Sequence, residues 1–190
     1  MKSMPIMRVG HPVLRQRSRS VTKKELRSKR FQQFLLRLAT TCKTSNGVGI
    51  AAPQVGIAKR IIVISIDDHN PRYIKKTPFP LTIVVNPRIV EKSATIQSDW
   101  EGDLSVDLRA LVPRHRSCIV EGLSPSGEKV HYVLDDPFHA RVFQHEIDHL
   151  NGILFLDRVT DKKSICETAM WRKYHKPRIL IKAGEEKNTN

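Results

Sequence analysis

The segment 136–152 reads DPFHARVFQHEIDHLNG, and it decides how the rest of the chain is organised. Asp136 followed by Pro137 is typical of a helix start. The aspartate side chain can accept the free N–H groups of the first turn, and proline fits the first helical position. No glycine or proline follows until Asn151-Gly152, a pair typical of a helix end. We therefore predict one helix from Asp136 to about Leu150.

This predicted helix carries the pattern HEIDH at 145–149. His145 and His149 project from the same face about one turn apart, so both imidazoles can bind one metal ion. Glu146 falls beside them on the apolar side of a helical wheel. The opposite side, which we expect to be polar and to face solvent, carries Arg141, Gln144 and Asp148.

A carboxylate buried beside two imidazoles is costly unless its charge is compensated. A divalent metal ion with a bound water provides that compensation. Glu146 would then take a proton from the water and pass it to the leaving group. HExxH also arises by chance, so the capped helix and the common face of the histidines carry this prediction. Catalytic sites of this kind normally have three protein ligands, and the third must come from another segment.

Three segments resemble the signature motifs of the peptide deformylases, in the order found in that family: GVGIAAPQ at 47–54, EGDLSV at 101–106 and QHEIDHLNG at 144–152. The similarity extends over roughly residues 5–160. The family removes the formyl group from the N-terminal methionine of new polypeptides. The resemblance therefore implies formyl-methionyl nascent chains as substrate. It also implies one divalent ion, Fe²⁺ before Zn²⁺, with Ni²⁺ or Co²⁺ as replacements.

The resemblance also implies a role for each catalytic position. His145 and His149 are metal ligands, and Glu146 is the acid and base. The side-chain amide of Gln54 and the backbone N–H of Leu104 form an oxyanion hole. Such donors stabilise the negative oxygen that forms when the formyl carbonyl is attacked.

The resemblance also implies which residues bind the substrate and which ones have a structural role. The backbone at Val48 and Gly49 would pair with the bound peptide like an added strand. Arg109 either contacts the peptide backbone or is a surface arginine. Glu101 and Arg114 resemble a structural ion pair beneath the metal loop.

One residue departs from the family pattern, which is EGCLS where this chain has EGDLS. Asp103 thus stands at the position of the metal-binding cysteine. A carboxylate carries the same single negative charge as a thiolate, and its oxygen binds metals at roughly 2.0–2.2 Å. We predict that Asp103 is the third ligand, through one oxygen or both; the alternative is a site that has lost its metal. Cys118 is expected in a separate strand, as a small core residue.

The sequence is compatible with three functions. The first is a deformylase acting on formyl-methionyl peptides. The second is a deformylase-like protein with lost or altered activity that binds peptides or the ribosome. The third is an HExxH protease, which would leave the GVGIAAPQ and EGDLS segments unexplained.

The charge of the chain is concentrated at its two ends. The net charge is +14. Residues 1–30 hold ten basic and one acidic side chain, residues 158–190 hold nine and four, and the middle is balanced. Basic ends of a chain favour binding to polyanions, so we expect ribosomal RNA as a partner. We expect binding neither to DNA nor to a membrane. No apolar run approaches the roughly 20 residues needed to span a bilayer.

Composition and length set the remaining expectations. The 190 residues suit one domain, which we place at 1–176, with a partly disordered tail at 177–190. Three cysteines without a CxxC pair indicate a reducing compartment. The start of the chain lacks a secretory signal. We predict a bacterial-type cytoplasmic protein and leave an organelle open.

The predicted fold class is α+β, with antiparallel β-sheets packed around the central HExxH helix, an N-terminal helix and a C-terminal helix. The flanking helices are expected at Lys23–Ser45 and Asp161–His175. The expected strands are Arg60–Ile66, Leu81–Val85, Thr95–Trp100, Ser117–Glu121 and Glu128–Leu134.

Overall fold

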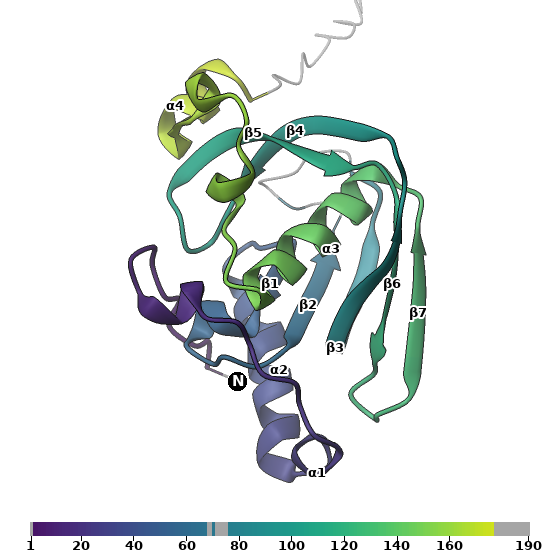
Figure 1. Ribbon diagram of the computed structural model, residues 1–190. Helices are drawn as coiled ribbons and strands as arrows, with labels where there is room; N and C mark the ends of the chain where they lie inside the picture. Colours follow the sequence, from purple (N-terminus) through teal and green to yellow (C-terminus); the bar gives the residue numbers. More distant parts are fainter. Residues whose placement is uncertain (1, 68–69, 71–75, 177–190) are drawn as a thin grey trace, which may run out of the picture.

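Two antiparallel sheets surround one central helix in the computed structural model, which describes residues 2–67, 70 and 76–176 (Figure 1). The larger sheet has the order β1-β2-β3-β6-β7, and the smaller one β4-β5-β8. This confirms the predicted α+β class with antiparallel sheets around the HExxH helix. Within the described residues, no helix is long and apolar enough to cross a membrane.

The strands are β1 Gly49–Ala51, β2 Ile61–Ile66, β3 Phe79–Lys92, β4 Ile96–Gly102, β5 Leu108–His115, β6 Cys118–Leu123, β7 Lys129–Leu134 and β8 Cys166–Glu167. The α-helices are α1 Lys23–Leu26, α2 Lys29–Thr44, α3 Pro137–Leu150 and α4 Thr168–Tyr174. Short 3₁₀ helices lie at Pro12–Arg15, Ala52–Val55, Phe155–Arg158 and Lys162–Ser164.

Strand β2 is buried on both faces, which explains why its sequence is apolar without alternation. Side chains alternate between the two faces of a strand. Ile62 and Ile64 belong to the core that contains α3, whereas Ile61 and Val63 belong to the core that contains α2. Both faces of the large sheet are therefore covered, and β2 is held between two helices. This placement fixes β1, its hydrogen-bonded neighbour, next to α3.

Helix α3 begins as its sequence predicts. The Asp136 side chain accepts hydrogen bonds from the N–H groups of Phe138 and His139, at 2.8 and 3.1 Å. Every residue from Ala140 to Leu150 is buried.

The solvent-facing side predicted for α3 is therefore wrong, because the small sheet covers it. Arg141 donates to the carbonyl oxygens of Gln97 and Val112, at 2.6 and 2.7 Å. Gln144 exchanges hydrogen bonds with the backbone of His115. Asp148 is also buried there. The wheel identified the polar side correctly, but it could not show that a second sheet packs on it.

The single helix predicted at Lys23–Ser45 is instead two helices. Ser28 has an extended backbone and separates α1 from α2. Its hydroxyl donates to the carbonyl of Glu25 at 2.8 Å and accepts the N–H of Phe31 at 3.3 Å. A serine side chain can thus end one helix and cap the next, a competition that periodicity does not reveal.

The C-terminal helix predicted at Asp161–His175 is much shorter. Cys166 and Glu167 form strand β8, which pairs with Arg109 and Leu108 of β5. The Ser164 hydroxyl accepts the N–H of Leu111 at 3.1 Å. These tertiary bonds take the place of the first helical turns. The predicted tail at 177–190 lies outside the described residues.

The sequence analysis also missed strand β5. Its segment contains Arg109, Pro113 and Arg114, residue types that are unfavourable within strands unless other segments compensate them. In the structure, β5 pairs with β4 from Arg109 to His115. The buried side chains of Arg109 and Arg114 interact with residues of α3, α4 and β4, as described below.

Replacing Asp136 with alanine should lower the free energy of unfolding by about 1 kcal/mol, because two N–H groups of α3 lose their acceptor. Urea unfolding measures this. Asp135→Ala is the matched control, since Asp135 is exposed; it should change stability by less than about 0.5 kcal/mol. Equal effects of the two substitutions would contradict the capping role.

Candidate metal centre

Three buried side chains converge at the middle of α3. The Nε2 atoms of His145 and His149 lie 3.2 Å apart. Oδ2 of Asp103 lies 3.7 Å from the first and 3.2 Å from the second. These atoms form the one cluster of histidine, cysteine, aspartate and glutamate side chains in the described part of the chain that could hold a metal ion. The structure thus brings together all three predicted ligands.

The separations among these atoms match a tetrahedral site. Ligand atoms at roughly 2.0–2.2 Å from an ion, at tetrahedral angles, lie about 3.3–3.6 Å from one another. Oδ2 of Asp103 is buried and has no hydrogen-bond partner among the described residues. An unpaired buried carboxylate oxygen is costly. A divalent cation at this point would satisfy it, so the residues present fit such an ion.

The other oxygen of Asp103 is already engaged. Oδ1 accepts the backbone N–H of Ser105 at 2.7 Å and the side-chain N–H of Gln54 at 2.8 Å. The carboxylate therefore offers one oxygen to an ion rather than both. Asp103 lies in the turn that follows β4, and its side chain is fully buried.

A second carboxylate orients His145. Nδ1 of His145 lies 2.9 Å from Oε2 of Glu101, which directs Nε2 of the same ring toward the ligand cluster. Glu101 also accepts two hydrogen bonds from Arg114, at 2.9 and 3.0 Å, and one from Arg141 at 2.7 Å. The predicted pair of Glu101 and Arg114 is present, and Arg141 extends it.

This network continues toward the end of α3. Asp148 accepts from Arg114, and it also binds Arg158 through both of its oxygens. Asp148 is therefore not a surface charge; it binds the Arg114 guanidinium, which in turn binds Glu101. Motif spacing could not reveal this role, because Arg114 is thirty-four positions away in sequence.

Burial and charge set the protonation of the central groups. Burial opposes ionisation of Asp103, but His149, His145 and the Ser105 N–H together outweigh burial and hold the pKa of the carboxyl well below its usual value. Burial likewise disfavours the charged form of His145, yet the bond to Glu101 raises its pKa to about 9. Metal binding would displace that proton. Burial raises the pKa of Glu146 to about 7, which suits a group that accepts and returns a proton near neutrality.

Glu146 lies against the backbone of β1. A Cβ atom at Gly49 would come within 2.5 Å of its Oε1 atom. Oε2 is buried and has no hydrogen-bond partner among the described residues. Gly49 is thus needed for the close approach of Glu146 to β1.

A small pocket of about 30 Å³ connects these groups. That volume is enough to admit a water molecule. The pocket is lined by Gly47, Val48, Gly49, Gln54, Gly102, Asp103, Leu104, His145 and Glu146. Seven of the nine predicted site residues therefore line one cavity, and His149 is buried beside Asp103.

Arg109, like His149, does not line this pocket. It is 2% exposed, so the surface alternative is wrong. Its guanidinium lies 4.6 Å from the ring centre of Trp171 in α4. A Cβ atom at Gly102 would clash with its side chain, so Arg109 packs directly beneath the metal loop. Contact with a substrate peptide stays a prediction.

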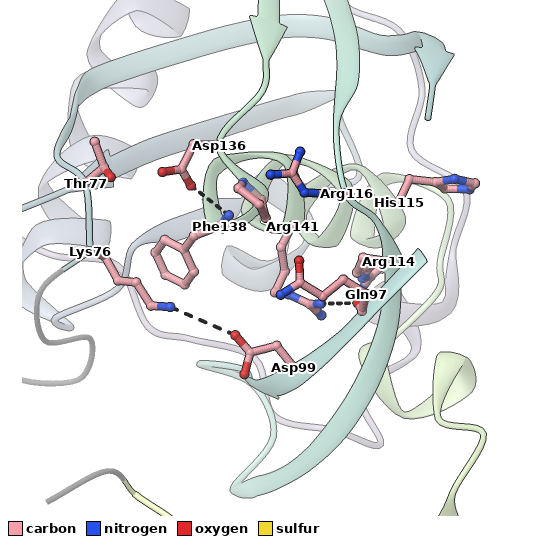
Figure 2. A pocket seen from close by; sticks show the side chains of 11 residues that line it. Lys76, Thr77, Gln97, Asp99, Arg114, His115, Arg116, Asp136, Phe138 and Arg141 are labelled. Carbon is pink, nitrogen blue, oxygen red and sulfur yellow. Dashed lines mark hydrogen bonds and ion pairs between the residues drawn. The ribbon is translucent and has the colours of Figure 1, made fainter. Parts of the chain in front are cut away.

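A larger polar pocket, of about 270 Å³, lies at the N-terminal end of α3 (Figure 2). Lys76 and Asp99 lie across its mouth, and Asp136 caps the helix within it. None of the three predicted ligands lines this pocket. It meets the ligand network through Arg114 and Arg141, whose guanidinium groups hold Glu101.

Comparison with known proteins agrees with this geometry. Residues 3–164 match the family model of polypeptide deformylase. The chain belongs to the polypeptide deformylase family. Peptide deformylase 2 of Nostoc sp. is 42% identical over 157 residues, which are 82% of this chain and 86% of that relative. The match confirms the predicted family and its enzyme class, a metal-dependent hydrolase.

Solved structures of the family have the same fold. A class I type b peptide deformylase from Acinetobacter baumannii superposes with a TM-score of 0.81 at 39% identity, covering 84% of this chain and all of that one. The enzyme from Thermotoga maritima gives 0.72 at 35% identity, covering 85% of this chain and all of that one. The role of Asp103 as a ligand stays a prediction.

Replacing Arg114 with alanine should destabilise the fold by about 3–5 kcal/mol, because the buried carboxylates of Glu101 and Asp148 lose a shared partner. Urea unfolding measures the loss. Arg116→Ala is the matched control: Arg116 lies two residues further on and is exposed. It should cost less than about 0.5 kcal/mol. Similar losses for both variants would show that the network contributes little.

Proposed function

We propose that this protein removes the formyl group from the N-terminal methionine of new polypeptides and releases formate, with Asp103, His145 and His149 holding one divalent ion. One observation carries the proposal: a buried carboxylate oxygen at position 103 that accepts no hydrogen bond from the described residues lies beside both imidazoles at ligand spacing. An aspartate there keeps the charge of the family's cysteine. We propose Fe²⁺ before Zn²⁺ as the native ion.

The ion, when bound, acts as a Lewis acid that makes water nucleophilic near neutral pH. The other steps belong to the residues of this chain. Glu146 takes the proton of the attacking water and returns it to the amine that leaves. Gln54 and the backbone N–H of Leu104 donate to the formyl oxygen as negative charge develops on it.

The edge of the larger sheet supports peptide binding at Val48 and Gly49. Strand β1 is the outermost strand and is paired on one side only, with β2, within the described residues. An unpaired strand edge is a template for an extended peptide. Such a peptide would lie beside the pocket that contains Glu146. This arrangement favours a linear, extended N-terminus as substrate.

The cytoplasmic, bacterial-type location is likewise a proposal. The relatives include bacterial proteins and a chloroplastic peptide deformylase 1A of tomato, which is 34% identical and of which this chain covers 61%. We also propose that residues 1–176 form a single domain.

Anaerobic protein loaded with Fe²⁺ should release formate from formyl-Met-Ala-Ser. Glu146→Gln should keep the metal but lower kcat at least about 100-fold, because proton transfer is lost. Asp103→Ala should lower the amount of bound metal. Formate detection and elemental analysis are the two measurements.

Several outcomes would reject this proposal. Equal, negligible metal in wild type and Asp103→Ala would show that the site does not bind an ion. Metal without formate release would favour the deformylase-like binding protein, and cleavage of casein without formate release would favour the protease.

We further propose ribosomal RNA as a partner of the basic N-terminal region. Lys23, Lys24, Arg27, Lys29 and Arg30 are all exposed around the junction of α1 and α2. The nearby Glu25 is paired with Lys59, so it does not neutralise this surface. Clustered cations on one exposed corner favour a phosphate backbone. The basic tail at 177–190 lies outside the described residues.

Binding to purified ribosomes should weaken as salt rises. The triple variant Lys24→Glu, Arg27→Glu and Arg30→Glu should lower the slope of log affinity against log salt by roughly two to three. The control Lys92→Glu, Arg116→Glu and Lys129→Glu changes three exposed cations elsewhere by the same total charge. Affinity independent of salt, or equal losses in both variants, would contradict a docking role for this corner.

A further inference from the structure

The two oxygens of Asp103 have different surroundings. Oδ2 faces the two imidazoles and accepts no hydrogen bond from the described residues. Oδ1 points the other way and accepts from Gln54 Nε2 and from the Ser105 backbone. Since the side chain is fully buried, water does not compete for either oxygen.

Gln54 is held from both ends of its amide. Its Oε1 atom accepts the backbone N–H of Ala51 at 2.8 Å, while its Nε2 atom donates to Asp103 at 2.8 Å and makes a longer contact of 3.4 Å with Oγ of Ser105. The N–H that makes the longer contact is the one that would turn to the formyl oxygen. A flipped amide would place two acceptors together at Asp103 and two donors together at Ala51. Both arrangements are unfavourable in a buried site, and Gln54 is 1% exposed. The amide therefore has one orientation, in which Nε2 lies on the side of Asp103.

A cysteine at position 103 could not provide this separation of tasks. A thiolate has a single acceptor atom, and that atom would have to bind the ion and receive the N–H groups of Gln54 and Ser105. A carboxylate supplies a second oxygen, and in this structure the second oxygen is the one that the donors use. The exchange of cysteine for aspartate thus adds an acceptor to the site.

We propose that Asp103 has two separable roles: Oδ2 binds the metal ion, and Oδ1 positions the Gln54 amide for donation to the formyl oxygen. The second role makes Asp103 a positioning residue for Gln54. It rests on the proposed function, because an oxyanion donor matters only where a carbonyl is attacked. A preorganised donor of this kind costs no reorganisation during the reaction.

Two substitutions separate the roles. Asp103→Asn keeps an oxygen that can accept from Gln54 and Ser105, but it places an uncharged amide group toward the imidazoles. Asp103→Cys keeps a charged ligand for the ion and removes the separate acceptor. The first variant should therefore keep the Gln54 orientation and lose the metal. The second should keep the metal and lose the orientation.

The orientation is read from the side-chain ¹H–¹⁵N pair of Gln54, assigned by its disappearance in Gln54→Ala. Spectra are compared for metal-free wild type and Asp103→Asn, and for Zn²⁺-loaded wild type and Asp103→Cys, with zinc content measured in each. Asp103→Asn should keep the wild-type shifts and bind little zinc. Asp103→Cys should bind zinc, with shifted Gln54 signals and roughly tenfold faster exchange with solvent, the scale of one lost hydrogen bond. Unchanged Gln54 signals in Asp103→Cys, or altered ones in Asp103→Asn, would overturn the proposal.

A double-mutant cycle measured by kcat gives a second, independent test of the positioning role. Gln54→Ala should lower kcat about tenfold more in wild type than in Asp103→Cys, because the amide is positioned only in the former. Equal losses in both backgrounds would overturn the positioning role while leaving the deformylase activity intact. Absence of formate release from loaded wild type would instead reject the proposed function, and the spectra would still decide whether Oδ1 holds Gln54.

Discussion

The carboxylate of Glu101 is the interaction on which the site depends. It lies one residue before the end of strand β4, is almost fully buried, and accepts four hydrogen bonds: two from Arg114, one from Arg141 and one from His145. Burial opposes its charge, but Arg114 and His145 together outweigh burial and hold the pKa of Glu101 well below its usual value. One ionised group thereby joins β4, β5 and α3. A buried charge with this many partners permits little movement, so the His145 ring is fixed relative to the loop that carries Asp103.

The geometry around Asp103 follows from that constraint. The turn after β4 places its side chain against α3, where one oxygen meets two imidazoles and the other meets Gln54 and Ser105. The site is thus assembled from three segments that are distant in sequence. Each segment contributes a different chemistry: a carboxylate oxygen, two imidazole nitrogens beside the carboxyl group of Glu146, and an oriented amide.

The burial that holds this network together also sets the chemistry of Glu146. The same dense packing leaves a pocket of about 30 Å³ and raises the pKa of Glu146 to about 7. Close approach of β1, made possible by the absence of a side chain at Gly49, completes the enclosure. Within the described residues, the unpaired edge of β1 lies beside this pocket, so one strand would determine both the proposed position of the peptide and the position of Glu146.

The sequence alone determined the features that depend on local spacing. The i, i+4 histidines, the cap at Asp136, the apolar strand at 61–66 and the order of three motifs could be predicted because each lies within a few neighbouring residues. It also located Asp103 as the residue that replaces a cysteine. Only the tertiary structure decided that Arg141 and Asp148 are buried, that Ser28 divides a helix, and that Asp103 uses one oxygen for Gln54. These features depend on partners far along the chain, and the free energy of burying a charge is settled by those partners rather than by its neighbours in sequence.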